Sequence, residues 1–276
     1  MKIVTDSATL YSPKEAEEMG FTVIPACVIN NGQTYRDFED ITSDEFLSLI
    51  KNGEVPTSSQ PSIGDVLEVL ENTQEEILYL SIGDGLSGAY QNAMGAKNTL
   101  ASNDHIHIID TKTLAGPERY LVQKALKLKE AGLDLVKIKT ELQKCIATSA
   151  SFVIPADFDF LKRSGRLTPI AAKIGGLIKI VPVLTQTEDM RRITPFAIKR
   201  SWKTAVEAII KHFSSLGINE NYIISISHAG APEKAKEVLK QIKEQFHNST
   251  FEFFQLSPTL ITHGGPGCVL IQVIKK

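Results

Sequence analysis

Short β-rich runs alternate with longer helical segments along the whole sequence of 276 residues. The helical segments repeat apolar residues at i, i+3 and i+4, and the runs between them are rich in β-branched side chains. Because parallel strands need long crossover connections, this alternation predicts an α/β fold with largely parallel sheets. The predicted strands are Lys2–Thr5, Thr22–Ile29, Ile77–Ile82, His105–Asp110, Phe152–Ile154, Ile178–Leu184, Tyr222–Ser227, Phe251–Leu256 and Val269–Ile274, and the helical segments include Asp44–Ile50, Asp65–Leu70, Tyr120–Ala131, Leu135–Ala147, Trp202–Phe213 and Glu233–Phe246.

The region 150–165 is where we expect the chain to pass from one unit to another. It follows the predicted helix Leu135–Ala147, begins a new strand, and leads through Gly165 into an apolar block. The length suits one large domain or two ordinary ones. The sequence therefore predicts two α/β domains, residues 1–160 and 161–276.

The charge and cysteine content argue against several classes of protein. The formal net charge is −2, so the overall charge gives no indication of nucleic acid binding, which usually needs a clustered basic face. Cys27, Cys145 and Cys268 form no CxxC pair, which favours a reducing compartment. No secretory signal is visible after Met1, and the most hydrophobic stretch, Ile174–Leu184, is far shorter than the ~20 residues that span a bilayer. We expect a cytoplasmic protein without a transmembrane segment.

Ligands of open α/β sheets collect in the loops where strands end and helices begin. The first such loop, Thr5-Asp6-Ser7, leaves three interpretations open. Asp6 could accept a phosphoryl group or bind a metal ion, although Ala8 stands where a phosphoaspartate site would place a second aspartate. Alternatively, Asp6 or Ser7 caps a turn or the following helix, or it has a structural polar role beside the ligand. His105 and His107 share one strand face without a third ligand, so we expect no metal site.

The second loop carries three consecutive hydroxyl side chains, Thr57, Ser58 and Ser59, between Pro56 and Pro61. Prolines restrict the backbone on both sides, so the loop should be stiff. The helix expected after it adds backbone N–H groups and the positive end of a helix dipole. The loop therefore suits an anion, and an ordinary Ser/Thr-rich loop is the alternative.

The third loop, Gly83-Asp84-Gly85-Leu86-Ser87-Gly88, fits the pattern GxGxxG and leaves three interpretations open. It could bind a dinucleotide through its glycines, although Asp84 would place a carboxylate beside the pyrophosphate. Ser87 could be the nucleophile of a hydrolase or acyl transferase, although a nucleophile elbow has its final glycine one place later. The loop could also present Ser87 to another anion.

A histidine begins the fourth loop, His263-Gly264-Gly265-Pro266-Gly267. Glycines let the backbone approach a ligand closely, and an imidazole can donate to a carboxylate or a phosphate. Two arginine side chains outside these four loops are also candidates. Arg166 lies either at the surface or opposite the anion, and Arg200 lies either at an exposed helix start or at a docking point.

These motifs together resemble the DegV family. They cover essentially the whole chain in the family's order, and five motifs in order are far more specific than any one of them. The resemblance implies two α/β domains with one long-chain fatty acid bound between them and no cofactor. The matching motifs are Thr5-Asp6-Ser7, Thr57-Ser58-Ser59-Gln60-Pro61-Ser62, Leu86-Ser87-Gly88-Ala89-Tyr90-Gln91, Gly165-Arg166-Leu167 and His263-Gly264-Gly265-Pro266-Gly267.

The resemblance also implies a binding protein without catalysis of its own. In bacteria with a fatty-acid kinase, such proteins present the carboxylate to a separate ATP-using subunit, which converts it to an acyl phosphate. Loading of the lipid would need at most a transient membrane contact. The residues that match the family's are Ser58, Ser59, Ser87, His263 and Arg166 at the carboxylate and Arg200 at the kinase interface.

Two segments depart from the family's pattern. After Asp110 the family tends to small and glycine residues, whereas this chain has Ala115-Gly116-Pro117-Glu118-Arg119. That bulk and charge bear on the shape of the lipid tunnel and on the acyl length it accepts. The segment Gly267-Cys268-Val269 is also heavier than the family's run of small residues.

Overall fold

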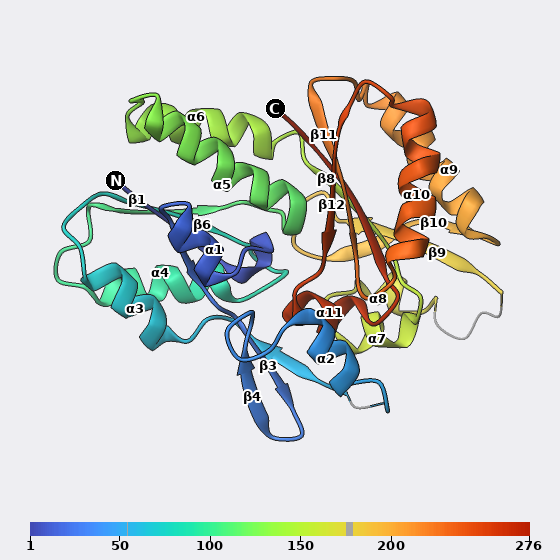
Figure 1. Cartoon of the computed structure of the whole chain (residues 1–276), viewed down its shortest axis with the longest axis horizontal. Helices are drawn as coiled ribbons and strands as arrows, with labels where there is room; N and C mark the ends of the chain where they lie inside the picture. The colour runs from blue at the N-terminus through green and yellow to red at the C-terminus, as the bar shows by residue number, and fades with distance from the viewer. Residues whose placement is uncertain (54, 175–178) are drawn as a thin grey trace.

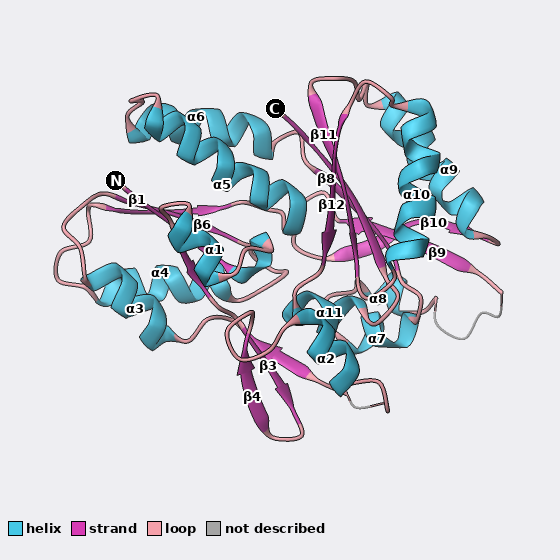
Figure 2. Ribbon diagram, in the orientation of Figure 1, coloured by secondary structure: helices cyan, strands magenta, loops and turns pink. Residues whose placement is uncertain are grey.

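The computed structural model describes residues 1–53, 55–174 and 179–276. Two large sheets lie next to each other, and a small sheet extends from the first (Figure 1). Figure 2 shows that helices cover the outer faces of the large sheets. None of the helices within the described residues is long and apolar enough to cross a membrane.

The first sheet has the order β2-β1-β6-β7, and all its strand pairs are parallel. Helices cover both faces, which explains why β6 is buried along its whole length. The parallel sheet that the alternation predicts is confirmed here. Its strands are β1 (Lys2–Asp6), β2 (Thr22–Ile24), β6 (Ile77–Ser81) and β7 (Ile106–Asp110), and its helices are α3 (Ile63–Glu71) and α4 (Ala89–Thr99) on one face and α5 (Ala115–Glu130) and α6 (Leu135–Ile146) on the other.

The second sheet has the order β10-β9-β8-β13-β11-β12. It belongs to the expected α/β class, but only the pair β11–β12 is parallel and the other four pairs are antiparallel. The antiparallel pairs arise because β9 and β10 form a hairpin and because the last strand, β13, inserts between β8 and β11. The strands are β8 (Ala150–Ile154), β9 (Val181–Gln186), β10 (Ile193–Lys199), β11 (Tyr222–His228), β12 (Thr250–Gln255) and β13 (Val269–Lys275).

The helices of this half lie on both sides of the second sheet. Helices α9 and α10 cover one face with a core that includes Phe213 and Ile242. On the other side, α5 and α6 contact Ile223 and Ile274 and thereby join the two large sheets through one core. The bounds are α7 (Phe158–Arg163), α8 (Pro169–Ala172), α9 (Trp202–Ser215), α10 (Pro232–Gln245) and α11 (Pro258–Gly264).

The small sheet has the order β4-β3-β5 and is antiparallel. It corrects two expectations. The predicted strand Thr22–Ile29 is interrupted at Pro25, so that its first part joins the first sheet and its second part the small one. The hydroxyl segment expected as a stiff loop is itself a strand. The elements are β3 (Cys27–Asn30), β4 (Gln33–Arg36) and β5 (Thr57–Ser59), with η1 (Ser7–Thr9), α1 (Pro13–Glu18) and α2 (Ser43–Leu49) nearby in sequence.

The chain enters the second sheet at β8, inside the region 150–165 where a change of unit is expected. The division at residue 160 stays a prediction. Residue 178, which begins the predicted strand Ile178–Leu184, lies outside the described residues.

Glu118, one of the residues that departs from the family's pattern, is completely buried in the first turn of α5. Neither of its carboxyl oxygens has a hydrogen-bond partner among the described residues. Burial, together with the nearby charges of Asp6 and Asp110, raises the pKa of Glu118 well above its ordinary value. The carboxyl group therefore keeps its proton to a higher pH than an exposed glutamate does.

We expect Glu118→Gln to become more stable than the wild type as the pH rises. Folding raises the pKa of Glu118 above 4.5, so the stability contributed by its protonated form is complete at low pH and is lost as the pH rises above about 4.5. An amide cannot ionise and escapes that loss. Urea unfolding of both proteins between pH 4 and pH 8 measures the difference. Glu130→Gln, on the exposed end of the same helix, is the control and should show no such trend. If the difference in unfolding free energy between Glu118→Gln and the wild type did not change with pH, it would contradict the raised pKa of Glu118.

Candidate functional site

Helix α11 carries His263 and is fixed at its start by two side chains. Ser257 caps the helix by accepting from the backbone N–H of Leu260, and Pro258 occupies the first turn. The buried carboxylate of Asp37 accepts from the backbone N–H of Thr259 at 3.0 Å. Since the helix is only two turns long, these contacts determine where its last turn places His263.

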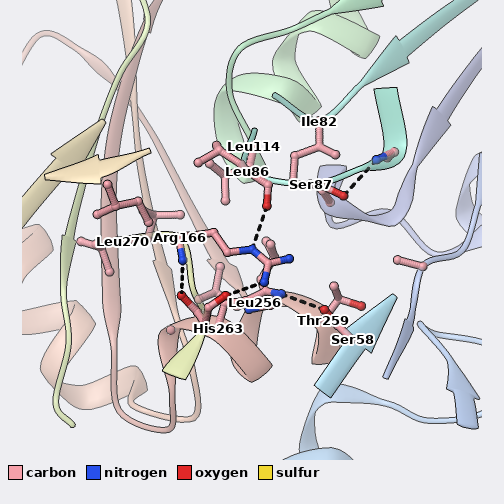
Figure 3. Close-up of a pocket in the computed structure, with 18 of the residues that line it drawn as sticks. Ser58, Ile82, Leu86, Ser87, Leu114, Arg166, Leu256, Thr259, His263 and Leu270 are labelled. Carbon is pink, nitrogen blue, oxygen red and sulfur yellow. Dashed lines mark hydrogen bonds between the residues drawn. The ribbon is translucent and has the colours of Figure 1, made fainter. Parts of the chain in front are cut away.

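His263 Nε2 lies 2.8 Å from the hydroxyl oxygen of Ser58, which belongs to the edge strand β5 (Figure 3). Burial and the neighbouring Arg166 lower the pKa of His263 to about 3. The imidazole is therefore neutral at physiological pH. Its other nitrogen, Nδ1, is buried and has no partner among the described residues.

Arg166 reaches the same place from the loop after α7. Its Nε donates to the backbone carbonyl of Leu86 at 3.2 Å, and Nη1 donates to the carbonyl of Ser164. Burial lowers the pKa of Arg166, but a guanidinium stays charged in proteins. No ion pair of the described residues includes Arg166. A cation thus lies beside a neutral imidazole without a carboxylate to balance it.

Ser87 lies at the start of α4, where its hydroxyl oxygen accepts from the backbone N–H of Ala89 at 3.2 Å. No histidine among the described residues bonds to Ser87, since His263 bonds to Ser58 instead. The arrangement therefore lacks the nucleophile–base contact that a serine hydrolase uses.

Other side chains of the protein pack directly against Gly85 and Gly88 of the same loop. A Cβ built on Gly85 would lie 2.7 Å from Arg191, and one built on Gly88 would lie 2.5 Å from the side chain of Gln60. Asp84 forms an ion pair with Arg191 at 2.6 Å. The space that a pyrophosphate would need at these glycines is occupied, which argues against the dinucleotide interpretation.

One cavity between the two large sheets joins these residues (Figure 3). Five of the residues predicted at the carboxylate, Ser58, Ser59, Ser87, Arg166 and His263, all line it. The structure thus brings together side chains from four separate segments of the sequence. The other walls are mainly aliphatic and include Ile82, Leu86, Leu114, Val153, Leu184, Leu256, Leu260 and Leu270.

The two neighbouring serines of β5 lie differently in this cavity. Ser58 contacts His263, whereas the hydroxyl of Ser59 lies beside the Cys27 thiol on the paired strand. Successive side chains of a strand point to opposite faces, which accounts for the difference.

Asp6 has the capping role that was one of its three interpretations. Its carboxylate accepts from the backbone N–H groups of Ala8 and Ile82, each at 3.0 Å. Burial nevertheless raises its pKa to about 6. Asp6 lines the cavity, but its oxygens are used to hold the ends of β1 and β6 together.

Other predicted residues lie outside the cavity. Arg200 is exposed at the end of β10, just before Ser201 caps α9. Within residues 1–53, 55–174 and 179–276, no group of His, Cys, Asp or Glu side chains could hold a metal ion. Asp37, which positions α11, is not part of a recognisable sequence motif, and it was not identified from the sequence.

An aliphatic cavity with a few hydroxyl, imidazole and guanidinium groups on its wall has the general character of a small-molecule site in an α/β protein. The family model described as "Uncharacterised protein, DegV family" matches residues 1–276, and the chain belongs to the DegV family. The family resemblance found in the motifs is thereby confirmed.

Individual relatives agree with this assignment over nearly their full length. A DegV domain-containing protein of Lactococcus lactis is 29% identical over 285 residues, with 100% of this chain and 98% of that protein covered. A fatty-acid-binding DegV family protein from Streptococcus agalactiae has a similar structure, with a TM-score of 0.89, 27% identity, and coverage of 100% of this chain and 98% of that one. A DegV family protein from Thermus thermophilus, described for its fatty acid binding, gives a TM-score of 0.88 at 26% identity, with 100% and 99% covered.

We expect the His263 imidazole to stay neutral from pH 8 to pH 5 in the ligand-free protein, because its folded pKa is about 3. NMR of the histidine ring protons measures this, and the signal that disappears in His263→Gln identifies the residue. A His263 signal that titrates with a midpoint near 6.5 would contradict the buried, neutral ring.

Proposed function

We propose that this chain binds one long-chain fatty acid in the cavity, with the carboxylate near Ser58, Ser59, Ser87, Arg166 and His263. The observation that carries the proposal is the unbalanced cation of Arg166 at a cavity whose other walls are mainly aliphatic. The DegV proteins from Streptococcus agalactiae and Thermus thermophilus, which share this fold, are described as binding fatty acids. The same chemistry in the same fold supports the same class of ligand here.

The aliphatic walls supply most of the affinity in this proposal. Burial stabilises a hydrocarbon chain by about 0.8 kcal/mol per CH₂, so roughly fourteen methylenes contribute about 11 kcal/mol before the costs of ordering. The polar groups then have one task, which is to compensate a carboxylate that would be very costly to bury unpaired.

The polar residues divide this task according to their charge. Arg166 supplies the positive charge, because His263 is neutral and no other Lys or Arg among the described residues lines the cavity. If His263 Nε2 donates to the Ser58 oxygen, the hydroxyl hydrogen of Ser58 is free to donate to the ligand. Ser87 adds a second hydroxyl at the positive end of α4.

The finer part of the proposal is that the protein presents the carboxylate to a separate fatty-acid kinase subunit. A carboxylate oxygen would attack the γ-phosphorus of ATP held by that subunit, forming an acyl phosphate and releasing ADP. In this proposal the present chain has no catalytic residue of its own. Arg200, exposed and outside the cavity, is the proposed contact with the kinase.

We expect solvent extraction of the purified protein, followed by mass spectrometry, to release about one fatty acid per chain. Arg166→Gln should weaken rebinding by roughly ten- to a hundredfold, because a charge-assisted bond is lost, and Ser58→Ala by about tenfold or less. Thr57→Ala is the matched control, since its exposed side chain is next to Ser58 but does not line the cavity. Absence of any fatty acid from the wild type, both as purified and after incubation with one, would sink the proposal.

Arg200→Glu tests the kinase contact separately. We expect unchanged fatty acid affinity but slower acyl phosphate formation when a fatty-acid kinase subunit and ATP are added, because the reversed charge repels the docking partner. Equal rates for Arg200→Glu and the wild type would remove Arg200 from the interface. Lys203→Glu, on the first turn of α9, is a control for a charge change nearby.

A further inference from the structure

The wall that the second sheet contributes to the cavity has two successive rows of side chains. In the first row, Leu270 pairs with Val153 and Val153 pairs with Leu184. All three are aliphatic, and all three line the cavity.

The second row is polar. Gln272 pairs with Ser151, and the β8–β9 register, which pairs Phe152 with Thr185, brings Gln186 beside Ser151. The two rows are two residues apart on each strand, so they share one face of the sheet. Ser151 and Gln186 line the cavity together with the aliphatic row.

Along β13, the polar row lies further from the helix of His263 than the aliphatic row does. Cys268, which directly precedes β13, touches the helix that carries His263, since a Cβ built on Gly264 would lie 2.5 Å from its sulfur. Gln272 is four residues further along the chain, about 13 Å at the rise of a strand. Along β13 the order from the helix of His263 is therefore aliphatic row, then polar row. On the β9 side, Gln186 lies close to the segment of Arg166, because its strand partner Ile193 donates its backbone N–H to the Arg166 carbonyl at 2.9 Å.

Ser151 has a hydroxyl hydrogen with no acceptor among the described residues. Its oxygen accepts from Gln272 Nε2 at 2.8 Å, and the same nitrogen donates to the carbonyl of Leu114 at 2.9 Å. Because the amide of Gln272 is fixed in this way, the Ser151 hydroxyl must use its hydrogen elsewhere.

Gln186 contributes an acceptor that also lacks a partner. Its Nε2 donates to the carbonyls of Lys112 and Met190, at 2.9 and 3.1 Å, which fixes the orientation of the amide. The opposite atom, Oε1, is buried without a hydrogen-bond partner in the described part of the chain. A hydrocarbon tail that covered these two groups would leave both unpaired, and such groups are costly to bury.

We propose that the cavity selects a fatty acid that carries a hydroxyl group along its chain. The ligand hydroxyl would donate to Gln186 Oε1 and accept from the Ser151 hydroxyl, which satisfies both groups at once. This inference rests on the proposed function, because it assumes that the carboxylate lies at Arg166 and His263. It identifies Ser151 and Gln186 as residues that determine specificity.

Competition binding of octadecanoic acid against a series of monohydroxyoctadecanoic acids tests the proposal. At the position that reaches the polar row, the hydroxylated acid should bind about tenfold more tightly than the plain acid, since two hydrogen bonds form. At other positions it should bind more weakly, because the hydroxyl meets aliphatic walls.

The variants Gln186→Leu and Ser151→Ala should each reduce this preference, and the double variant should favour the plain acid. Leu184→Met, in the aliphatic row, is the control and should change the affinities for both acids equally. Thermal unfolding of each variant verifies that it folds. If the double variant does not fold, the reduced preference of Gln186→Leu alone tests the proposal.

Two outcomes overturn the inference in different ways. If plain and hydroxylated acids bind equally at every position, the polar row holds water, and the proposed function survives while this inference fails. If no fatty acid of either kind binds, both fail together.

Discussion

The buried carboxylate of Asp37 is the interaction on which the site depends most. One oxygen accepts from Thr259 at the start of α11, 222 residues away in sequence, and the other accepts from the Ser7 hydroxyl. Ser7 in turn accepts from the backbone N–H of Ala26, which directly precedes β3. Helix α11 carries His263, and β3 pairs with the strand that carries Ser58. A single carboxylate therefore fixes both members of the Ser58–His263 contact.

The fold could be predicted from the sequence where local pattern and tertiary structure agree. Strand β6 is buried on both faces by helices, so its continuous apolar run, Ile77–Leu80, identifies it. The sequence pattern did not predict the structure where pairing with a distant strand decides it. The hydroxyls of β5 have no strand-like composition and form a strand because β3 pairs with them. The antiparallel order of the second sheet depends on where β13 inserts, which periodicity does not record.

The site could be predicted in its residue types but not in its connections. Ordered motifs led to five side chains that line one cavity, although none of them alone was specific. The contact of Ser58 with His263, the anchoring by Asp37 and the polar row of Ser151 and Gln186 all join strands and helices far apart in the sequence. Such contacts follow from strand register and helix placement, and a single sequence carries no local signal for either.

The charge of the site also bears on the proposed transfer of a phosphoryl group. With His263 neutral, Arg166 alone would balance the carboxylate of the proposed fatty acid, and the pair would carry no net charge. An acyl phosphate at the same place adds a second negative charge, which the site does not match unless a proton enters. His263 takes up that proton only if the added charge raises its pKa from about 3 to near neutrality. Asp6, which also lines the cavity, has a pKa of about 6 and needs a far smaller rise. Under the proposed function, a neutral histidine therefore holds the substrate without excess charge, and Asp6 takes up a proton more readily than His263 when the product forms.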